Sequence, residues 1–176
     1  MHPSLQILFD DLEKRRENTL AAFRQYPAEQ LNQRPGANQW SAAEVFSHLI
    51  TAERLSVAYL NKKLPGLHDL GHTGLLEELK MTLLVISQRM PGMKFKAPKR
   101  VVESTTLHAS LSEIEAAWTS VRQELHGLLD RFPPDGMNRK IYKHPVAGYL
   151  NIRQTLRFLR EHLIHHRPQL RRLLHP

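Results

Sequence analysis

The sequence predicts an all-α fold, and three observations support that prediction. Segments rich in proline and glycine divide the 176 residues into stretches of helical length. Within those stretches apolar residues recur at intervals of three and four, the period of an amphipathic helix. No stretch alternates apolar and polar residues convincingly enough to predict a strand. Five helices are therefore expected, in a single domain, residues 1–176, that is long enough to bury a core.

Two of the expected helices carry start signals in the sequence. The first covers residues 5–26, and Ser4 stands where an N-cap is expected. The second begins at Ser41 and runs to about Lys63. Glu44 follows Ser41 by three residues, which is the spacing of a capping box, in which each side chain bonds the other residue's amide. This pair predicts where the second helix starts.

Three more helices are expected, at about 75–90, 111–131 and 149–174. The stretch "KHPVAGYL" precedes the last of them and contains turn-forming proline and glycine. We therefore expect His144 to lie in a turn, with Tyr149 and Leu150 in the first turn of the final helix.

Residues 91–109, between the third and fourth expected helices, are predicted to form a solvated loop. The Lys and Arg residues at 94–100 have no helical spacing, which is typical of an exposed basic segment. Val101 and Val102 are β-branched and favour a short extended piece within this loop.

The stretch "EHLIHHRPQL" places three histidines on the final helix. Because each helical residue turns about 100° from the last, their directions can be predicted. His162 and His166, one turn apart, fall along the edge of the apolar face. His165 falls on the polar side, where it meets water or supports the other two rings. Two imidazoles four residues apart can both reach one metal ion at about 2.0–2.1 Å, so this pair supplies part of a metal site.

The second helix supplies a third inward histidine, His48, which shares its direction with Val45, Ala52 and Leu55. A single histidine in such a place is most simply a core residue with a hydrogen-bonded ring. Three of them on two helices instead favour a metal site between facing helices, and three protein ligands leave a position open, as in catalytic sites. Because the chain has no cysteine, such an ion needs His, Asp or Glu ligands.

Three further residues of the second helix are secondary candidates. Glu44 lies one turn before His48, so it either orients the His48 ring, accepts a proton near the ion, or serves only in the capping box. Thr51 and Tyr59 point in a similar direction and are candidates to line a pocket, although core packing explains Tyr59 equally well.

The residues around these histidines resemble the DinB/YfiT-like four-helix-bundle metalloproteins. The resemblance is carried by "QWSAAEVFSHLITAE" around His48 and by "HPVAGYLNIRQTLRFLREHLIHHRPQL" around the other two histidines. In that family a Trp-Ser or Trp-Thr helix start precedes a ligand histidine, an HPxxG-like turn opens the last helix, and that helix carries HxxxH with a following Gln-Leu. Pro168 departs from the pattern, and a proline inside a helix predicts a kink between residues 164 and 168.

The resemblance implies both a fold and a site. The implied fold is an up-down-down-up four-helix bundle with an additional helix and loop inserted around residues 64–108. The implied site holds one divalent ion, zinc, nickel or iron, on His48, His162 and His166. Many relatives are homodimers, and characterised ones include bacillithiol transferases and a mycothiol-dependent maleylpyruvate isomerase. The implied function is a thiol-dependent S-transferase, in which the ion activates a low-molecular-weight thiol toward a small-molecule substrate.

Two other functions stay open on the sequence. The same ion, with Glu44 as a base, suits metal-dependent hydrolysis by metal-bound water. A non-catalytic binding module with a basic surface is the second, since the formal net charge is +8. The arginines of the final helix spread around its polar arc without interleaved aromatics, which gives little support to nucleic-acid binding.

The N-terminal stretch "MHPSLQILFDDLEKRR" lacks the pattern of a secretory signal, and no segment is long and apolar enough to span a membrane. We therefore expect a cytoplasmic protein with no membrane partner.

Overall fold

The structure, a computed structural model, describes residues 1–90 and 99–174 and is mainly helical, which confirms the predicted all-α class. Two short 3₁₀ turns and one hairpin accompany the helices. The α-helices are α1 (Pro3–Ala21), α2 (Ala28–Asn32), α3 (Ala42–Lys63), α4 (Leu75–Arg89), α5 (Lys99–Ser104), α6 (Leu111–Asp130) and α7 (Ile152–Leu174). The remaining elements are η1 (Leu64–Asp69), η2 (Pro134–Gly136), β1 (Tyr142–His144) and β2 (Gly148–Leu150).

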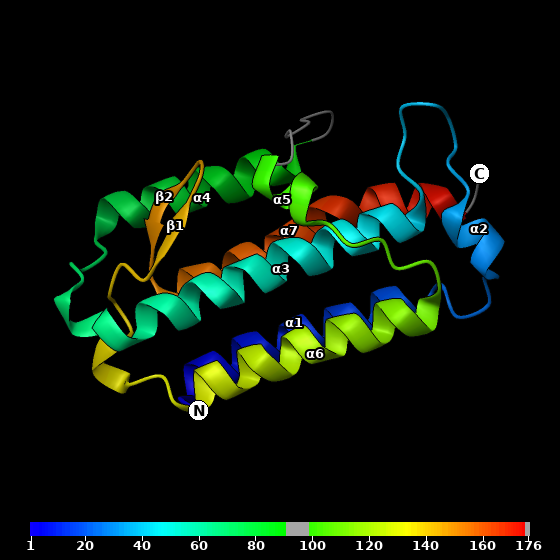
Figure 1. Cartoon of the computed structure of the whole chain (residues 1–176). Coiled ribbons are helices and arrows are strands. Elements are labelled where there is room, and N and C mark those ends of the chain that lie inside the picture. The colour runs from blue at the N-terminus through cyan, green and yellow to red at the C-terminus, as the bar shows by residue number, and fades with distance from the viewer. Residues whose placement is uncertain (91–98, 175–176) are drawn as a thin grey trace.

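Four long helices, α1, α3, α6 and α7, form the bundle (Figure 1). In that view α1 and α7 run from left to right and α3 and α6 run from right to left, which is the up-down-down-up order. Helix α1 packs against α6 and α7, and α3 packs against the same two helices. The inserted segment adds α4, which lies along the outer side of α7, and α5, which lies on α3. The implied bundle and its additional helix are therefore confirmed.

Buried apolar side chains from all four bundle helices form one continuous core. A buried ion pair lies within it, between Glu53 of α3 and Arg122 of α6, whose Oε1 and Nε atoms are 2.7 Å apart. The indole of Trp118 donates a second bond to Glu53, at 2.6 Å. Because both charges are buried and paired, loss of either partner would leave the other uncompensated, so the pair holds α3 and α6 in one register.

The first helix starts two residues earlier than predicted. His2 is the N-cap, with its Nδ1 accepting a bond from the amide of Ser4, and Pro3 is the first helical residue. The prediction of Ser4 as N-cap is therefore wrong, because proline, which has no amide proton to leave unpaired, suits the first helical position. The helix also ends at Ala21 instead of 26. The second expected helix starts as predicted, since Ser41 and Glu44 make both bonds of the capping box.

The segment before α7 is a β-hairpin, so the prediction of Tyr149 and Leu150 as helical is wrong. Both lie in β2, which pairs antiparallel with β1. His144 does lie at the turn, as predicted, and its Nδ1 accepts bonds from the amides of Val146 and Ala147, at 3.1 and 3.0 Å. Gly148 follows with a φ of 76°, a backbone conformation that glycine adopts without strain. The turn is thus closed by a side chain instead of by the first turn of a helix.

The predicted extended piece at Val101 and Val102 is also wrong, because both residues lie in the short helix α5. Packing of α5 against α3 outweighs the β-propensity of two valines. Most of the basic run at 94–100 lies outside the described residues. Helix α7 continues through Pro168 to Leu174, as expected. Among the described helices, none is both long and apolar enough to cross a membrane.

Candidate metal centre

Three histidines from two helices of the bundle meet at one point. His48 lies on α3, and His162 and His166 lie one turn apart on α7. Each offers one ring nitrogen, and the three nitrogens all lie within 4.8 Å of one another. The Nε2 atoms of His48 and His162 are 3.2 Å apart. The sequence predicted this set from helical direction, and the packing of α3 against α7 brings its members together.

The spacing of these nitrogens fits a shared metal ion. Two nitrogen ligands, each at about 2.0–2.1 Å from one ion and separated by about 90–110°, lie roughly 3–3.4 Å apart. The 3.2 Å between His48 and His162 falls in that interval. Ring centroids of the three imidazoles are 5.0–5.1 Å from one another, so no pair is splayed. The donor set is all imidazole, which suits zinc, nickel, copper and iron.

The three rings are held in the neutral form that binds a metal. Burial lowers the pKa of His48 to about 4 and that of His166 to about 3, and it lowers the pKa of His162 well below its ordinary value. Nearby imidazoles lower each pKa further, because two positive rings repel. His48 is buried, and His162 and His166 are half-buried.

Two aromatic side chains pack on the cluster. The indole of Trp40 lies 5.1 Å from the ring of His48 and is stacked over His166, 6.5 Å between centroids. Phe158 stacks on His162 from the preceding turn of α7, at 5.8 Å. These rings limit the rotation of the imidazoles and exclude water from one side. Helical spacing, with His162 four residues after Phe158, is the sequence signal that identifies the second contact.

One side chain outside the predicted set orients an imidazole. Nδ1 of His166 donates to Oε1 of Gln169, 3.0 Å away on the next turn of α7. A metal-binding histidine is usually fixed in this way, since the bond on one ring nitrogen sets the tautomer and leaves the other free. Gln169 therefore prepares Nε2 of His166 as a ligand atom.

His165 does not face open solvent. Its Nδ1 donates to the backbone carbonyl of Gln88, 2.8 Å away at the end of α4. Of the two alternatives that the sequence left open, contact with water and support of the other two rings, the structure favours the second: α4 packs against α7, and the ring of His165 lies 5.2 Å from that of His166. His165 also ties the inserted helix to α7 beside the cluster.

Glu44 is engaged at the start of α3. Its carboxylate accepts from the amide of Ser41 at 2.9 Å and from Nε of Arg34 at 2.8 Å. The bond from Arg34 is the largest cause that lowers the pKa of Glu44. The predicted capping box is therefore confirmed. Its lowered pKa makes the carboxylate of Glu44 a weaker proton acceptor.

The two predicted pocket residues lie in packed surroundings. Thr51 is buried, 1% exposed, one turn after His48. The ring of Tyr59 meets that of Tyr142 edge-on, at 5.4 Å between centroids. Packing thus accounts for Tyr59, and contact of either residue with a ligand stays a prediction.

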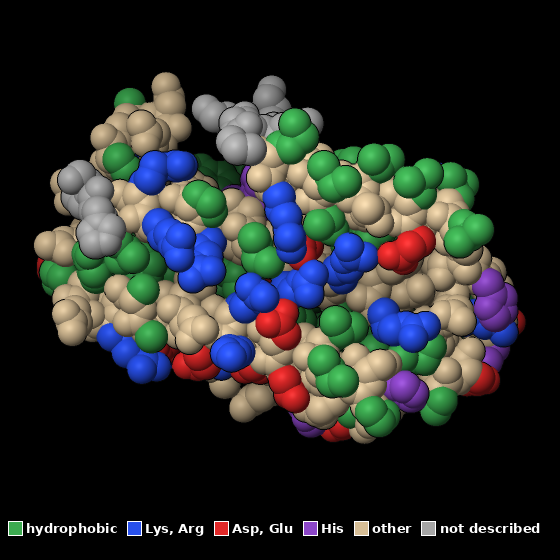
Figure 2. Space-filling model, turned by 180° about the vertical axis from the view of Figure 1, so that it is seen from behind, with side chains coloured by type: hydrophobic (Ala, Val, Ile, Leu, Met, Phe, Trp, Pro, Cys, Tyr) green, Lys and Arg blue, Asp and Glu red, His purple; other side chains and the backbone are tan. Residues whose placement is uncertain are grey.

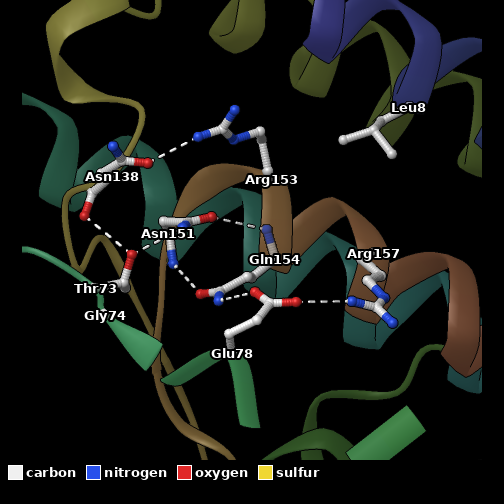
Figure 3. A pocket seen from close by; sticks show the side chains of 9 residues that line it. All are labelled: Leu8, Thr73, Gly74, Glu78, Asn138, Asn151, Arg153, Gln154 and Arg157. Carbon is white, nitrogen blue, oxygen red and sulfur yellow. Dashed lines mark hydrogen bonds and ion pairs between the residues drawn. The ribbon is translucent and has the colours of Figure 1, made fainter. Parts of the chain in front are cut away.

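A separate hollow of about 410 Å³ lies where α4 and α7 begin (Figure 3). Its polar side chains bind one another. Gln154 donates to Glu78 at 2.8 Å, Arg157 donates to the same carboxylate at 3.1 Å, and Asn151 donates to Thr73 at 2.8 Å. Because these groups satisfy each other, the hollow serves to join α4 to α7 and is a weaker candidate site than the histidine cluster.

Comparison with known proteins agrees with this geometry. A family model described as the DinB superfamily matches residues 11–170. The chain is similar to the uncharacterized protein YuaE of Bacillus subtilis (strain 168), with 26% identity over 145 residues, 82% of this chain and 83% of that protein. No solved structure matches the chain. The family match covers all of α3 and α6, the second half of α1, most of α7 and all three histidines of the cluster.

Proposed function

The chain belongs to the DinB superfamily, and from that premise we propose that it is a metal-dependent S-transferase that uses a small-molecule thiol. His48, His162 and His166 would hold one divalent ion, of zinc, nickel or iron. The single observation that carries the proposal is the meeting of three imidazoles whose ligand nitrogens lie within 4.8 Å of one another. Three protein ligands are the number found in catalytic sites, where a further position takes a water or a substrate.

An ion in this place would favour the thiolate form of a bound thiol, which is its nucleophilic form. The chain itself contains no cysteine, so the thiol must come from a small molecule. Trp40 and Phe158 give the site apolar walls that exclude water from the reacting sulfur. A cytoplasmic location, where such thiols are kept reduced, is part of this proposal.

Hydrolysis is less well supported. It needs a base to take a proton from water, and Glu44 was the candidate. Arg34 donates to both carboxylate oxygens and the amide of Ser41 donates to one of them, and these bonds lower the pKa of the carboxylate. A transferase does not depend on Glu44, because a thiol is more acidic than water and a bound ion by itself favours the thiolate form.

A non-catalytic module with a basic surface is also less well supported. Basic side chains run along α7 in Figure 2, but acidic side chains lie among them. Arg157 is paired with Glu78 at 3.1 Å, and Arg160 is paired with Glu161 at 2.6 Å. Pairing of this kind reduces the field that would attract a polyanion.

Metal content tests the first part of the proposal. Protein purified without a histidine tag should carry one equivalent of a divalent metal by elemental analysis, or take up one on reconstitution. His48→Ala and His162→Ala should each lose that equivalent. His68→Ala is the matched control, because its side chain is 63% exposed and it lies in η1, beyond the end of α3, outside the cluster. Full metal content in both cluster variants would refute the site.

Thiol dependence tests the second part. The metal-loaded protein is incubated with a panel of low-molecular-weight thiols and an electrophile such as 1-chloro-2,4-dinitrobenzene. We expect thioether formation that requires both the thiol and the metal and that His48→Ala abolishes. Ester or amide cleavage at the same rate with no thiol present would favour the hydrolase instead.

A further inference from the structure

Gln88, near the end of α4, carries a buried acceptor for which the chain provides no donor. The residue is only 8% exposed, and it lies with Met81, Leu84 and Val85 among the buried residues of α4, which packs against α7. Among the described residues, none donates a hydrogen bond to the side-chain oxygen, Oε1. Leaving a buried acceptor without a donor destabilises the folded state, so such an atom needs an explanation.

This oxygen differs from the other buried polar atoms without a hydrogen bond. In the part of the chain that the structure describes, those atoms belong to charged side chains, of Glu13, Arg16, Glu53, Arg122 and Arg139. Ion pairs, or bonds to other atoms of the same group, compensate these charged side chains. The amide of Gln88 is neutral, so no ion pair offsets the bond that its oxygen lacks.

Gln88 lies beside the histidine cluster. Its backbone carbonyl accepts a bond from Nδ1 of His165 at 2.8 Å, and the ring of His165 lies 5.2 Å from that of His166. Helix α4 runs in the same direction as α7, so the end of α4 reaches the level of the cluster (Figure 1). One imidazole therefore separates the residue with the unbonded acceptor from the three candidate ligands.

The backbone of Gln88 is fixed in place. His165 holds its carbonyl, and the next residue, Arg89, makes two hydrogen bonds to the buried carboxylate of Glu161, at 2.7 and 2.8 Å. Because of these contacts, α4 cannot turn about its axis to bring the side chain of Gln88 into water. The donor for Oε1 must therefore come from a molecule that enters the protein.

We propose that Oε1 of Gln88 accepts a hydrogen bond from the thiol that the protein uses, and hence that this thiol carries an N–H or O–H group close to its sulfur. The inference rests on the proposed function and names the substrate class of the same site. A site with a buried acceptor for one substrate group rejects an analogue that lacks this group, because the acceptor then stays unbonded. Gln88 thus determines specificity and is not a ligand of the ion.

Urea unfolding in the presence of a chelator tests whether Oε1 is unbonded when no thiol is present. Gln88→Met keeps the length of the side chain and removes the amide, so it should raise the urea midpoint, by about 0.5 M. Gln154→Met is the matched control. Gln154 is 5% exposed, but its side chain bonds the amide of Asn151 and the carboxylate of Glu78. Its replacement should lower the midpoint.

Binding of two thiols of equal size tests recognition. The probes 2-mercaptoethanol and 1-propanethiol differ in that a hydroxyl group of the first stands in place of a methyl group of the second. Calorimetry with the zinc-loaded protein should give an affinity about 10-fold higher for 2-mercaptoethanol. In Gln88→Met this preference should disappear, while the zinc content by elemental analysis stays that of the wild-type protein.

The outcomes separate this inference from the proposed function. If neither thiol binds the zinc-loaded protein, the proposed function fails and the inference fails with it. Equal affinity of the wild-type protein for both thiols, or a preference that survives in Gln88→Met, would overturn the role of Gln88 alone. A urea midpoint that does not rise in Gln88→Met would show that Oε1 already has a donor, such as a buried water, and would also overturn it.

Discussion

Nδ1 of His166 donates a hydrogen bond to the side-chain oxygen of Gln169, 3.0 Å away, so that Nε2 is the nitrogen left for an ion. Ring orientation in this cluster is therefore set by a residue that lies on the same helix, one turn later. Such supporting bonds typically contribute a factor of about 10–100 to metal affinity.

We expect Gln169→Leu to weaken metal binding by about 10–100-fold, because the ring of His166 would lose the acceptor that fixes its tautomer. Gln169→Glu should keep the affinity or raise it, since a carboxylate accepts the same bond and makes the ring more basic. Competition with a chromophoric chelator measures the dissociation constants. Gln123→Leu, at an exposed position of α6, is the matched control. Equal affinity in all four proteins would show that Gln169 has no role at the cluster.

His144 should make stability depend on pH. Its Nδ1 accepts two amide bonds in the hairpin turn, and burial lowers its pKa from 6.5 to about 4. Between these values the unfolded chain binds a proton that the folded chain does not. Stability is therefore complete above about pH 6.5 and falls as the pH drops toward 4, by up to roughly 3 kcal/mol for this group.

The contribution of His144 is isolated by comparison with His144→Asn, whose side chain can accept turn amides but does not titrate. Urea unfolding of both proteins, with a chelator present throughout, gives the free energy of unfolding at each pH. The advantage of the wild-type protein should shrink between pH 6.5 and 4. Two curves that stay parallel across this interval would contradict the assignment.

Arg89 should control how firmly α4 stays on the bundle. Its guanidinium pairs with Glu161, whose side chain is fully buried. In Arg89→Met only Arg160 would still compensate that charge, so we expect a loss of roughly 1–3 kcal/mol. Hydrogen exchange should speed up in α4 and not in α3 or α6. Arg153→Met, at an exposed residue of α7 whose guanidinium donates to the side chain of Asn138, should change neither the stability nor the exchange rates in α4.

The bundle and the histidine cluster were predictable because both follow from periodicity. Apolar residues at intervals of three and four place His48 and His162 on inward faces whatever the loops do. The cluster then requires only that α3 packs against α7, and contacts of this kind are common in four-helix bundles. Gln169 and Phe158 follow from the same rule, since they lie three and four residues from a cluster histidine on one helix.

The start of α7 was mispredicted because a local signal was overlooked. Asn151 and Gln154 have capping-box spacing, and each side chain bonds the other's amide, at 2.9 and 3.0 Å. Because of this pair the helix begins at Ile152, and Tyr149 lies before it, in a strand. The place of His165 could not be predicted in this way, because it depends on α4 covering α7, a long-range contact that the helical projection of α7 does not contain.

Gly136 should tolerate no side chain. A methyl group at its Cα would collide with Cδ2 of Leu67 and lie 3.3 Å from Cε1 of Phe132, and both of those side chains are buried. We expect Gly136→Ala to destabilise the protein by about 1–3 kcal/mol, because the overpacked side chains must leave their preferred rotamers.

Gly127→Ala, in the interior of α6, is the contrasting variant. Its new methyl group comes no closer than 3.7 Å to the side chain of Arg131. It should stabilise the protein by about 0.5–1 kcal/mol, because alanine restricts the unfolded chain. Urea unfolding measures both changes, and equal effects at the two sites would show that the contact with Leu67 does not constrain position 136.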